Sequence, residues 1–127
     1  MGYTVMIIDD SEIIRSVLKR AVDLSGLPVS EVVTATDGVD GLEKLEKNWV
    51  DIVFTDINMP RMNGIELFDR MLERKDLKNI PVVVVSTEGS SLRIDELRSK
   101  GIKGYLRKPC TPESVRDVIV NVLGEWK

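Results

Sequence analysis

Carboxylate, hydroxyl and amine side chains stand at the ends of short apolar segments along this sequence. They are Asp9 and Asp10 after segment 3–8, Asp56 after 51–55, Ser86 after 82–85 and Lys108 after 104–106. Oxygen ligands without histidine or cysteine favour Mg²⁺ or Mn²⁺ over zinc. A carboxylate neutralised by such a cation can attack a phosphoryl group, while an ammonium and a hydroxyl stabilise the phosphoryl oxygens. These residue types predict a site that forms an aspartyl phosphate.

The sequence contains no histidine and a single cysteine, Cys110. Without histidine the chain has no imidazole base, no Ser–His or Cys–His nucleophile pair and no phosphohistidine of its own. One cysteine can form neither an internal disulfide nor a cysteine-rich zinc site, which favours a reducing, cytoplasmic setting. A phosphoryl group would therefore have to arrive from another protein or from a small molecule.

Composition predicts one globular domain. The chain has 127 residues, of which 43% are hydrophobic and 31% charged, so we expect a single domain over 1–127 and no appended effector domain. The N-terminus has no basic opening or cleavage site, and no apolar run approaches the roughly 20 residues that span a bilayer. A net charge of −3 gives no general attraction to nucleic acid or anionic lipid. We expect neither as a partner.

Short apolar segments alternate with helical patterns, which is typical of a parallel sheet with crossover helices. Strands are predicted at the five segments 3–8, 29–35, 51–55, 82–85 and 104–106, and helices after Ser11, after Asp37, from Ile65, from Ser90 or Ser91, and from Pro112. Five such units predict an α/β fold, a doubly wound (βα)5 three-layer sandwich. Ligands of such sheets bind at the carboxyl ends of the strands, where the polar residues stand.

Apolar periodicity also predicts which helix faces are buried. The expected core positions are Ile13, Ile14, Val17, Leu18, Ala21 and Val22 in the first helix, Val39, Leu42 and Leu45 in the second, Ile65, Phe68, Met71 and Leu72 in the third, and Val115, Val118, Ile119, Val122, Leu123 and Trp126 in the last. Gly38 and Gly41 weaken the second helix.

Taken one at a time, the polar residues also have purely structural interpretations. Asp9 and Asp10 could compensate the dipole of the first helix, Ser86 could satisfy backbone groups, and Lys108 could be a solvated surface lysine. Tyr105 alone would be a packing residue. Basic residues of the C-terminal third form either a solvated surface or a docking face for an acidic partner.

Four motifs together resemble the receiver domain of bacterial response regulators, of the single-domain chemotaxis (CheY-like) type. They are Asp9-Asp10, the stretch Asp56-Ile57-Asn58-Met59-Pro60 with Met62-Asn63-Gly64, Ser86-Thr87, and Gly104-Tyr105-Leu106-Arg107-Lys108-Pro109. The resemblance spans essentially the whole chain. It implies a flavodoxin-like fold with a five-stranded parallel sheet of order 2-1-3-4-5.

The resemblance also implies the chemistry of the site. Asp56 would accept a phosphoryl group from a sensor histidine kinase or phosphotransfer protein. Asp10, Asp56 and the backbone carbonyl of Asn58 would hold Mg²⁺, or alternatively Mn²⁺, and Asp9 would act through water. Lys108 would pair with the phosphoryl group.

Further residues are implied to transmit the signal. Ser86 would move toward the phosphoryl group, so that Tyr105 turns from a solvent-facing to an inward position. This would reshape the face made by the helix from Ser91, the strand 104–106 and the helix from Pro112, where a target protein binds. The Lys108–Pro109 bond would be cis.

Two positions, Asn58 and Glu88, match those that tune the lifetime of the aspartyl phosphate in this family. Their polar character implies fairly quick dephosphorylation. Cys110 and Thr87 depart from the aromatic residue and the alanine that are common there, which bears on switching rather than on the acceptor.

Other functions fit the sequence less well. A Mg²⁺-dependent phosphatase working through an aspartyl phosphate would carry a second acid two residues after Asp56, where Asn58 stands. A flavin carrier would need neutral or basic donors where Asp9-Asp10-Ser11 is acidic. A degenerate receiver that uses only protein contacts would not need the intact acidic and lysine positions. We therefore expect a signalling protein and not a dedicated enzyme.

Overall fold

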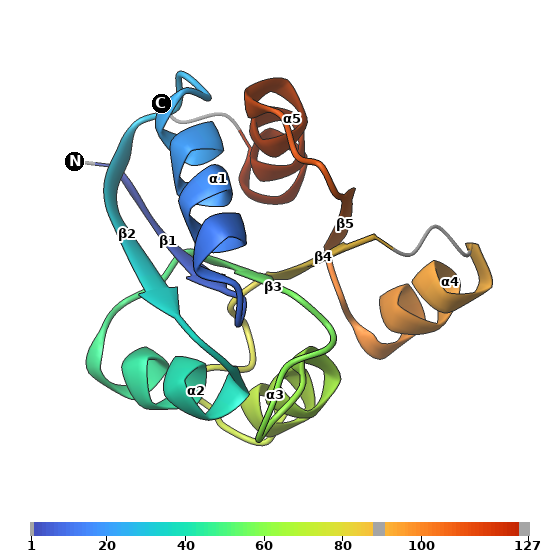
Figure 1. Cartoon of the computed structure of the whole chain (residues 1–127). Coiled ribbons are helices and arrows are strands. Elements are labelled where there is room, and N and C mark those ends of the chain that lie inside the picture. Colours follow the sequence, from blue (N-terminus) through green and yellow to red (C-terminus); the bar gives the residue numbers. More distant parts are fainter. Residues whose placement is uncertain (1, 88–90, 125–127) are drawn as a thin grey trace.

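The computed structural model describes residues 2–87 and 91–124. Strands and helices alternate along the chain (Figure 1). They are β1 (Tyr3–Ile8), α1 (Glu12–Asp23), β2 (Val29–Ala35), α2 (Gly38–Lys47), β3 (Ile52–Thr55), α3 (Gly64–Leu72), β4 (Val82–Ser86), α4 (Ser91–Lys100), β5 (Gly104–Arg107) and α5 (Pro112–Leu123). No helix in this described part of the chain combines the length and apolar character needed to cross a membrane.

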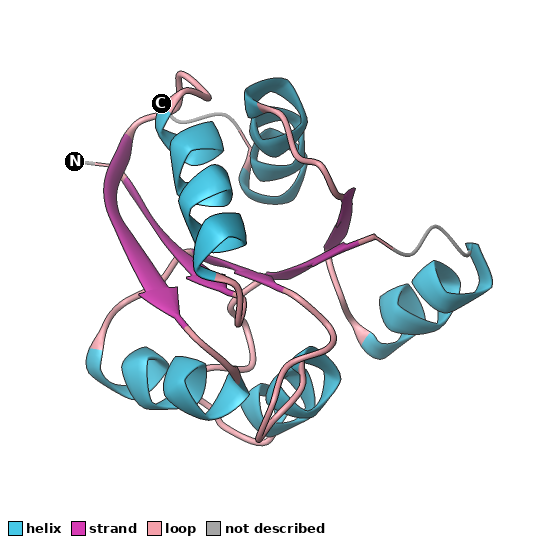
Figure 2. Ribbon diagram, in the orientation of Figure 1, coloured by secondary structure: helices cyan, strands magenta, loops and turns pink. Residues whose placement is uncertain are grey.

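The strands form one parallel sheet of order β2-β1-β3-β4-β5. Helices α1 and α5 cover one face of the sheet, and α2, α3 and α4 lie on the other (Figures 1 and 2). This arrangement confirms the predicted doubly wound (βα)5 sandwich and its strand order. Each helix returns the chain so that all strands end at the same edge of the sheet, which is the edge that carries the predicted site.

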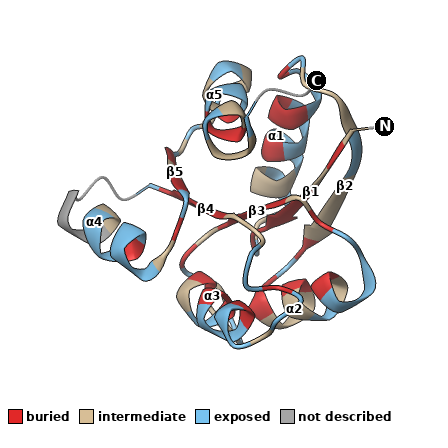
Figure 3. Cartoon of the chain, turned by 180° about the vertical axis from the view of Figure 1, so that it is seen from behind, coloured by how far each residue is buried: buried red, intermediate tan, exposed pale blue. Residues whose placement is uncertain are grey.

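Burial on both faces explains the apolar strands (Figure 3). All side chains of β4 are buried; Val82 and Val84 pack toward α2, α3 and α4, whereas Val83 and Val85 pack toward α1 and α5. Successive side chains of a strand point to opposite faces, so a strand covered on both sides must be apolar at every position. The sheet therefore lies between two layers of buried hydrophobic side chains.

Polar side chains at the helix starts set where the helices begin. Ser11, Asp37, Asn63 and Thr111 each accept a hydrogen bond from the backbone N–H three residues later. These bonds satisfy amide groups that have no partner within the helix. Because Asn63 is the cap, α3 begins at Gly64, one residue before the predicted Ile65.

The predicted buried faces of α1 and α3 were partly wrong. Ile13 and Val17 are 75% and 45% exposed, and Leu72 is 42% exposed, whereas Leu67 is fully buried. At about 100° per residue, Ile13 and Val17 lie at the edge of the arc that is centred on Ile14, Leu18 and Ala21 and faces the sheet. In α3 the packed arc is turned toward Leu67, which moves Leu72 outward. The predicted core residue Trp126 lies outside the described residues.

Candidate functional site

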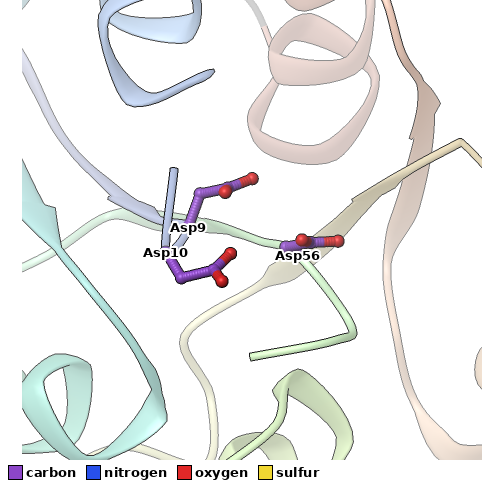
Figure 4. Close-up of side chains that lie close together, drawn as sticks. All are labelled: Asp9, Asp10 and Asp56. Carbon is purple, nitrogen blue, oxygen red and sulfur yellow. The ribbon is translucent and has the colours of Figure 1, made fainter. Parts of the chain in front are cut away.

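Three carboxylates meet at the carboxyl edge of the sheet (Figure 4). Asp9 and Asp10 follow β1, and Asp56 follows the neighbouring strand β3. The strand ladder continues one step into the site, because the N–H of Asp56 donates to the carbonyl of Ile8 over 3.0 Å. One oxygen from each of the three carboxylates lies within 4.8 Å of the others. The sheet thus brings together acids that are far apart in sequence.

Asp9 is the most buried member of this acidic cluster, with 1% of its surface exposed. Its Oδ1 accepts a hydrogen bond of 2.9 Å from the N–H of Ser11, and its Oδ2 accepts one of 3.0 Å from Lys108 Nζ. The Arg15 side chain also donates to the Asp9 carbonyl, at 2.7 Å. Both carboxylate oxygens of Asp9 are therefore engaged by the protein itself, whereas Asp10 is exposed at the mouth of the site.

Lys108 reaches the cluster from the end of β5. Its Nζ lies 3.0 Å from Asp9 Oδ2 and 3.5 Å from Asp56 Oδ2. Its backbone N–H donates to the carbonyl of Ser86 over 2.9 Å, and the Lys108–Pro109 peptide bond is cis. Burial acts to lower the pKa of Lys108, but the hydrogen bond to Asp9 and the charges of Asp56 and Asp9 raise it above its usual value. The lysine is therefore a cation in this site.

The surroundings of Asp56 disfavour its charged form. Burial and the neighbouring charge of Asp9 raise the pKa of Asp56, although Lys108 and the N–H of Ile57 act in the opposite direction. The Ile57 N–H donates to Asp56 Oδ1 over 2.8 Å. Three acids, with Lys108 and Arg15 as the nearby cations, still leave an excess of negative charge. An oxygen-only donor set with such an excess fits a hard divalent cation.

The loop 57–63 carries Asn58 beside the acidic cluster. Its first residue, Ile57, is 2% exposed and anchors the loop, and Asn58 is exposed. The N–H of Gly64 donates to the Ile57 carbonyl over 2.8 Å, closing the loop at its root. Asn58, whose backbone carbonyl is the predicted metal ligand, therefore directly follows the buried Ile57.

Ser86 and Tyr105 lie on the neighbouring strands β4 and β5. Ser86 ends β4 and is 3% exposed. Tyr105 is half-buried, and its hydroxyl oxygen is enclosed instead of solvent-facing; within the described residues this oxygen has no hydrogen-bond partner. A buried phenol usually finds a hydrogen-bond partner, and none of the described residues provides one for Tyr105 in this conformation.

The remaining positions singled out in the sequence differ in their surroundings. Thr87 is exposed, and Glu88 lies outside the described residues. Cys110 is half-buried and packs against the core layer formed with α1 and α5. Burial raises the pKa of the Cys110 thiol. This cysteine therefore behaves as a small packed hydrophobe next to the site.

Sequence reasoning missed an ion pair beside the loop. The Arg61 side chain donates to both carboxylate oxygens of Asp37, over 2.7 and 3.1 Å. From the sequence, Asp37 only preceded a predicted helix, and Arg61 had no predicted role. The two residues are 24 positions apart, and no local spacing rule connects an arginine in a turn with a cap on another helix.

Comparison with known proteins supports the geometry. Residues 5–120 match the family described as the response regulator receiver domain. The chain belongs to the response regulator receiver family. Receiver domains among its relatives include chemotaxis protein CheY1 of Helicobacter pylori, which is 33% identical over 120 residues, 94% of this chain and 95% of that protein. The chemotaxis protein CheY of Treponema pallidum is 35% identical over 123 residues, 95% of this chain and 83% of the relative.

Solved structures agree with the family. CheY4 of Vibrio cholerae is 31% identical and superposes with a TM-score of 0.85, covering 96% of this receiver domain and 99% of the CheY4 chain. A chain from the CheX–CheY–BeF3–Mg²⁺ complex of Borrelia burgdorferi is 28% identical, with a TM-score of 0.83 and coverage of 95% and 89%. This receiver domain is thus of the CheY type.

Proposed function

We propose that this receiver domain is a phosphoacceptor signalling protein and not a dedicated enzyme. A sensor histidine kinase or phosphotransfer protein transfers a phosphoryl group to Asp56, and a separate target protein reads the altered surface. The observation that carries the proposal is the position of the Asp56 carboxylate, at a strand end beside Asp9 and Asp10 and 3.5 Å from the ammonium of Lys108. The unpaired Cys110 is in keeping with action in the cytoplasm.

The acidic cluster is proposed to hold Mg²⁺, for which Mn²⁺ can substitute. The ligands would be Asp10, Asp56 and the backbone carbonyl of Asn58. Asp9 would act through water, since both of its carboxylate oxygens already accept hydrogen bonds within the protein. When bound, the cation offsets the negative charges of the carboxylates and of the phosphoryl oxygens.

Asp56 provides the nucleophile for transfer. One of its carboxylate oxygens forms a bond to phosphorus as the bond between phosphorus and the donor nitrogen or oxygen breaks, and the leaving group keeps that electron pair. Lys108 is held in place by Asp9 and stabilises the charge on the phosphoryl oxygens. The hydroxyl of Ser86, at the end of the next strand, donates to a phosphoryl oxygen. Asn58 and Glu88 tune how readily water removes the phosphoryl group.

The output is proposed to leave through the face formed by α4, β5 and α5. Strands β4 and β5 pair so that Val84 lies opposite Tyr105 and Ser86 opposite Arg107. A movement of Ser86 is thereby transmitted to the strand that carries Tyr105. An open groove of about 440 Å³ lies beside that strand, lined among others by Arg98, Lys103 and Tyr105. This groove gives a target protein a surface that depends on Tyr105.

Incubation with acetyl phosphate tests the proposal without the native kinase. With Mg²⁺ present, mass spectrometry of the intact protein is expected to show the addition of one phosphoryl group. The Asp56→Asn variant is expected to gain none, and the control Asp69→Asn, an exposed aspartate of α3, should behave as the wild type. Absence of any gain, or an equal gain in Asp56→Asn, would overturn the proposal.

A further inference from the structure

An ion pair between the buried carboxylate of Asp37 and the exposed side chain of Arg61 fastens the loop 57–63 to the start of α2. The carboxylate of Asp37 is 5% exposed, and Arg61 is its charged partner, with Nε at 2.7 Å and Nη2 at 3.1 Å. A buried carboxylate is costly without a charged or hydrogen-bonding partner. The hydrogen bonds from Arg61 hold the pKa of Asp37 below its usual value, against the opposing effect of burial. The loop therefore supplies the positive charge that pairs with the Asp37 carboxylate.

Arg61 is held in a backbone conformation that arginine rarely adopts. Its φ is +63°, in the left-handed region that glycine and asparagine tolerate best. Among the described residues, no other residue except glycine has a positive φ. Besides Asp37, the guanidinium faces the charges of Glu43 and Asp40, all from α2 or its cap. Arg61 keeps this conformation while its side chain pairs with Asp37 at the start of α2.

A backbone contact beside the ion pair fixes the same end of the loop. The N–H of Gly38 donates to the carbonyl of Met62 over 3.0 Å. A Cβ atom at position 38 would lie 2.6 Å from that carbonyl oxygen, so the approach requires glycine. The far end of the loop is thus held against the first turn of α2 by one ion pair and one backbone hydrogen bond.

The near end of the loop contacts the phosphoacceptor directly. The Ile57 N–H donates to Asp56 Oδ1, and the Ile57 carbonyl accepts from the N–H of Gly64. Asn58 lies between this anchor and the one at Arg61. A change in the path of the loop near Arg61 can therefore be passed along the chain to the Asn58 carbonyl and to the Asp56 carboxylate.

We propose that Asp37 and Arg61 are positioning residues of the acidic site: their ion pair fixes the loop 57–63 so that Asp56 and Asn58 are arranged to bind a divalent cation. This inference rests on the proposed function, since it assigns these residues a role in that same site. These two residues act through the loop, so the position of α2 affects the affinity of the site for the cation.

Conservative variants separate positioning from folding. Asp37→Asn keeps a residue that caps a helix equally well but removes the charge. Arg61→Asn keeps a residue that tolerates a positive φ but removes the guanidinium. Arg74→Asn is the matched control, because Arg74 also pairs with an acid of α2, Glu46, at 2.7 Å, but at the opposite end of that helix.

Calorimetric titration of each unphosphorylated variant with Mg²⁺ is the test, together with hydrogen–deuterium exchange of residues 57–63. Loss of partners that orient metal ligands typically weakens affinity at least tenfold, so both Asp37→Asn and Arg61→Asn should bind Mg²⁺ roughly tenfold more weakly. Exchange in the loop should rise in both. The double variant should be no weaker than the single variants, since both remove the same contact. Arg61→Lys should restore part of the affinity, and Arg74→Asn should match the wild type.

The outcomes distinguish this inference from the proposed function. If the wild type binds Mg²⁺ and both variants bind it equally well, the positioning role is overturned while the proposed site stands. Variants that unfold more readily but keep wild-type Mg²⁺ affinity overturn the positioning role in the same way, because a purely structural role would do only that. If the wild type itself binds no Mg²⁺, the cation site of the proposed function falls, and this inference falls with it.

Discussion

Lys108 makes its shorter contact with Asp9 and its longer one with Asp56, at 3.0 and 3.5 Å. Asp9 is almost completely buried, and an unpaired charge there would be costly. Because Lys108 is shared with Asp9, it only partly compensates the charge of Asp56. The raised pKa of Asp56, caused by its burial and by Asp9, reflects that incomplete compensation. A carboxylate whose charge is poorly compensated gains most from a bound cation. Asp9 thus holds Lys108 in position, and the Asp56 carboxylate is left with a charge that a cation can compensate.

Replacement of Lys108 by alanine is expected to slow phosphorylation of Asp56 by acetyl phosphate about a hundredfold, the usual effect of deleting one group that stabilises transition-state charge. The initial rate of mass gain at saturating Mg²⁺ measures it. Lys103→Ala, which changes an exposed lysine just before β5, is the control and should retain the wild-type rate. A wild-type rate in Lys108→Ala would show that the ammonium serves only to neutralise Asp9.

The Asp56→Asn variant is expected to be more stable than the wild type when Mg²⁺ is absent. Burial and Asp9 both disfavour the charge of Asp56, and asparagine removes that charge with little change of shape. Thermal unfolding in the presence of a chelator measures the difference at neutral pH. Added Mg²⁺ should stabilise the wild type far more than the variant, because a ligand stabilises the state that binds it. A less stable variant without Mg²⁺ would contradict repulsion within the cluster.

The location of the site could be predicted from sequence because strand ends are marked locally. Asp9 and Asp56 each follow an apolar run, and the alternation of strands and helices predicts that those runs are parallel neighbours. The pairing of Arg61 with Asp37 could not be predicted in this way. It depends on a positive φ at Arg61 and on the tertiary approach of a loop to α2, neither of which leaves a periodic signal.

Helix existence was predictable, whereas the buried arc of each helix was only partly so. Ile13 and Leu67 are both apolar and both lie on amphipathic helices, yet the first is exposed and the second is fully buried. Periodicity defines the apolar arc to within one position, and tertiary packing decides which edge of that arc is covered. The exposure of Ile13 therefore follows from packing and not from composition.

Gly41→Ala is expected to destabilise the protein, although alanine favours helices more than glycine does. A Cβ at position 41 would lie 2.6 Å from Cδ1 of the fully buried Ile8, which ends β1 just before Asp9. Overpacking of this kind costs about 1–3 kcal/mol, which exceeds the gain of up to about 1 kcal/mol in helix propensity. Urea unfolding measures the net loss. Ile8→Val removes the clashing Cδ1 atom, so the double variant should recover most of the stability that Gly41→Ala loses. Strictly additive losses would show that Ile8 does not cause the clash.

The Asp37–Arg61 ion pair predicts a stability that falls in acid. Hydrogen bonds from Arg61 lower the pKa of Asp37 in the folded protein, so the pair contributes stability above the unfolded-state pKa of about 3.9. This contribution is lost as the pH falls through the lower pKa of the folded state. Urea unfolding between neutral pH and about pH 3 should therefore show the wild type approaching Asp37→Asn in stability as the pH falls. In Arg61→Asn the buried Asp37 loses its cation and its pKa rises, so stability should begin to fall at a higher pH than in the wild type. A difference between wild type and Asp37→Asn that stays constant across this range would show that the charge of Asp37 contributes nothing.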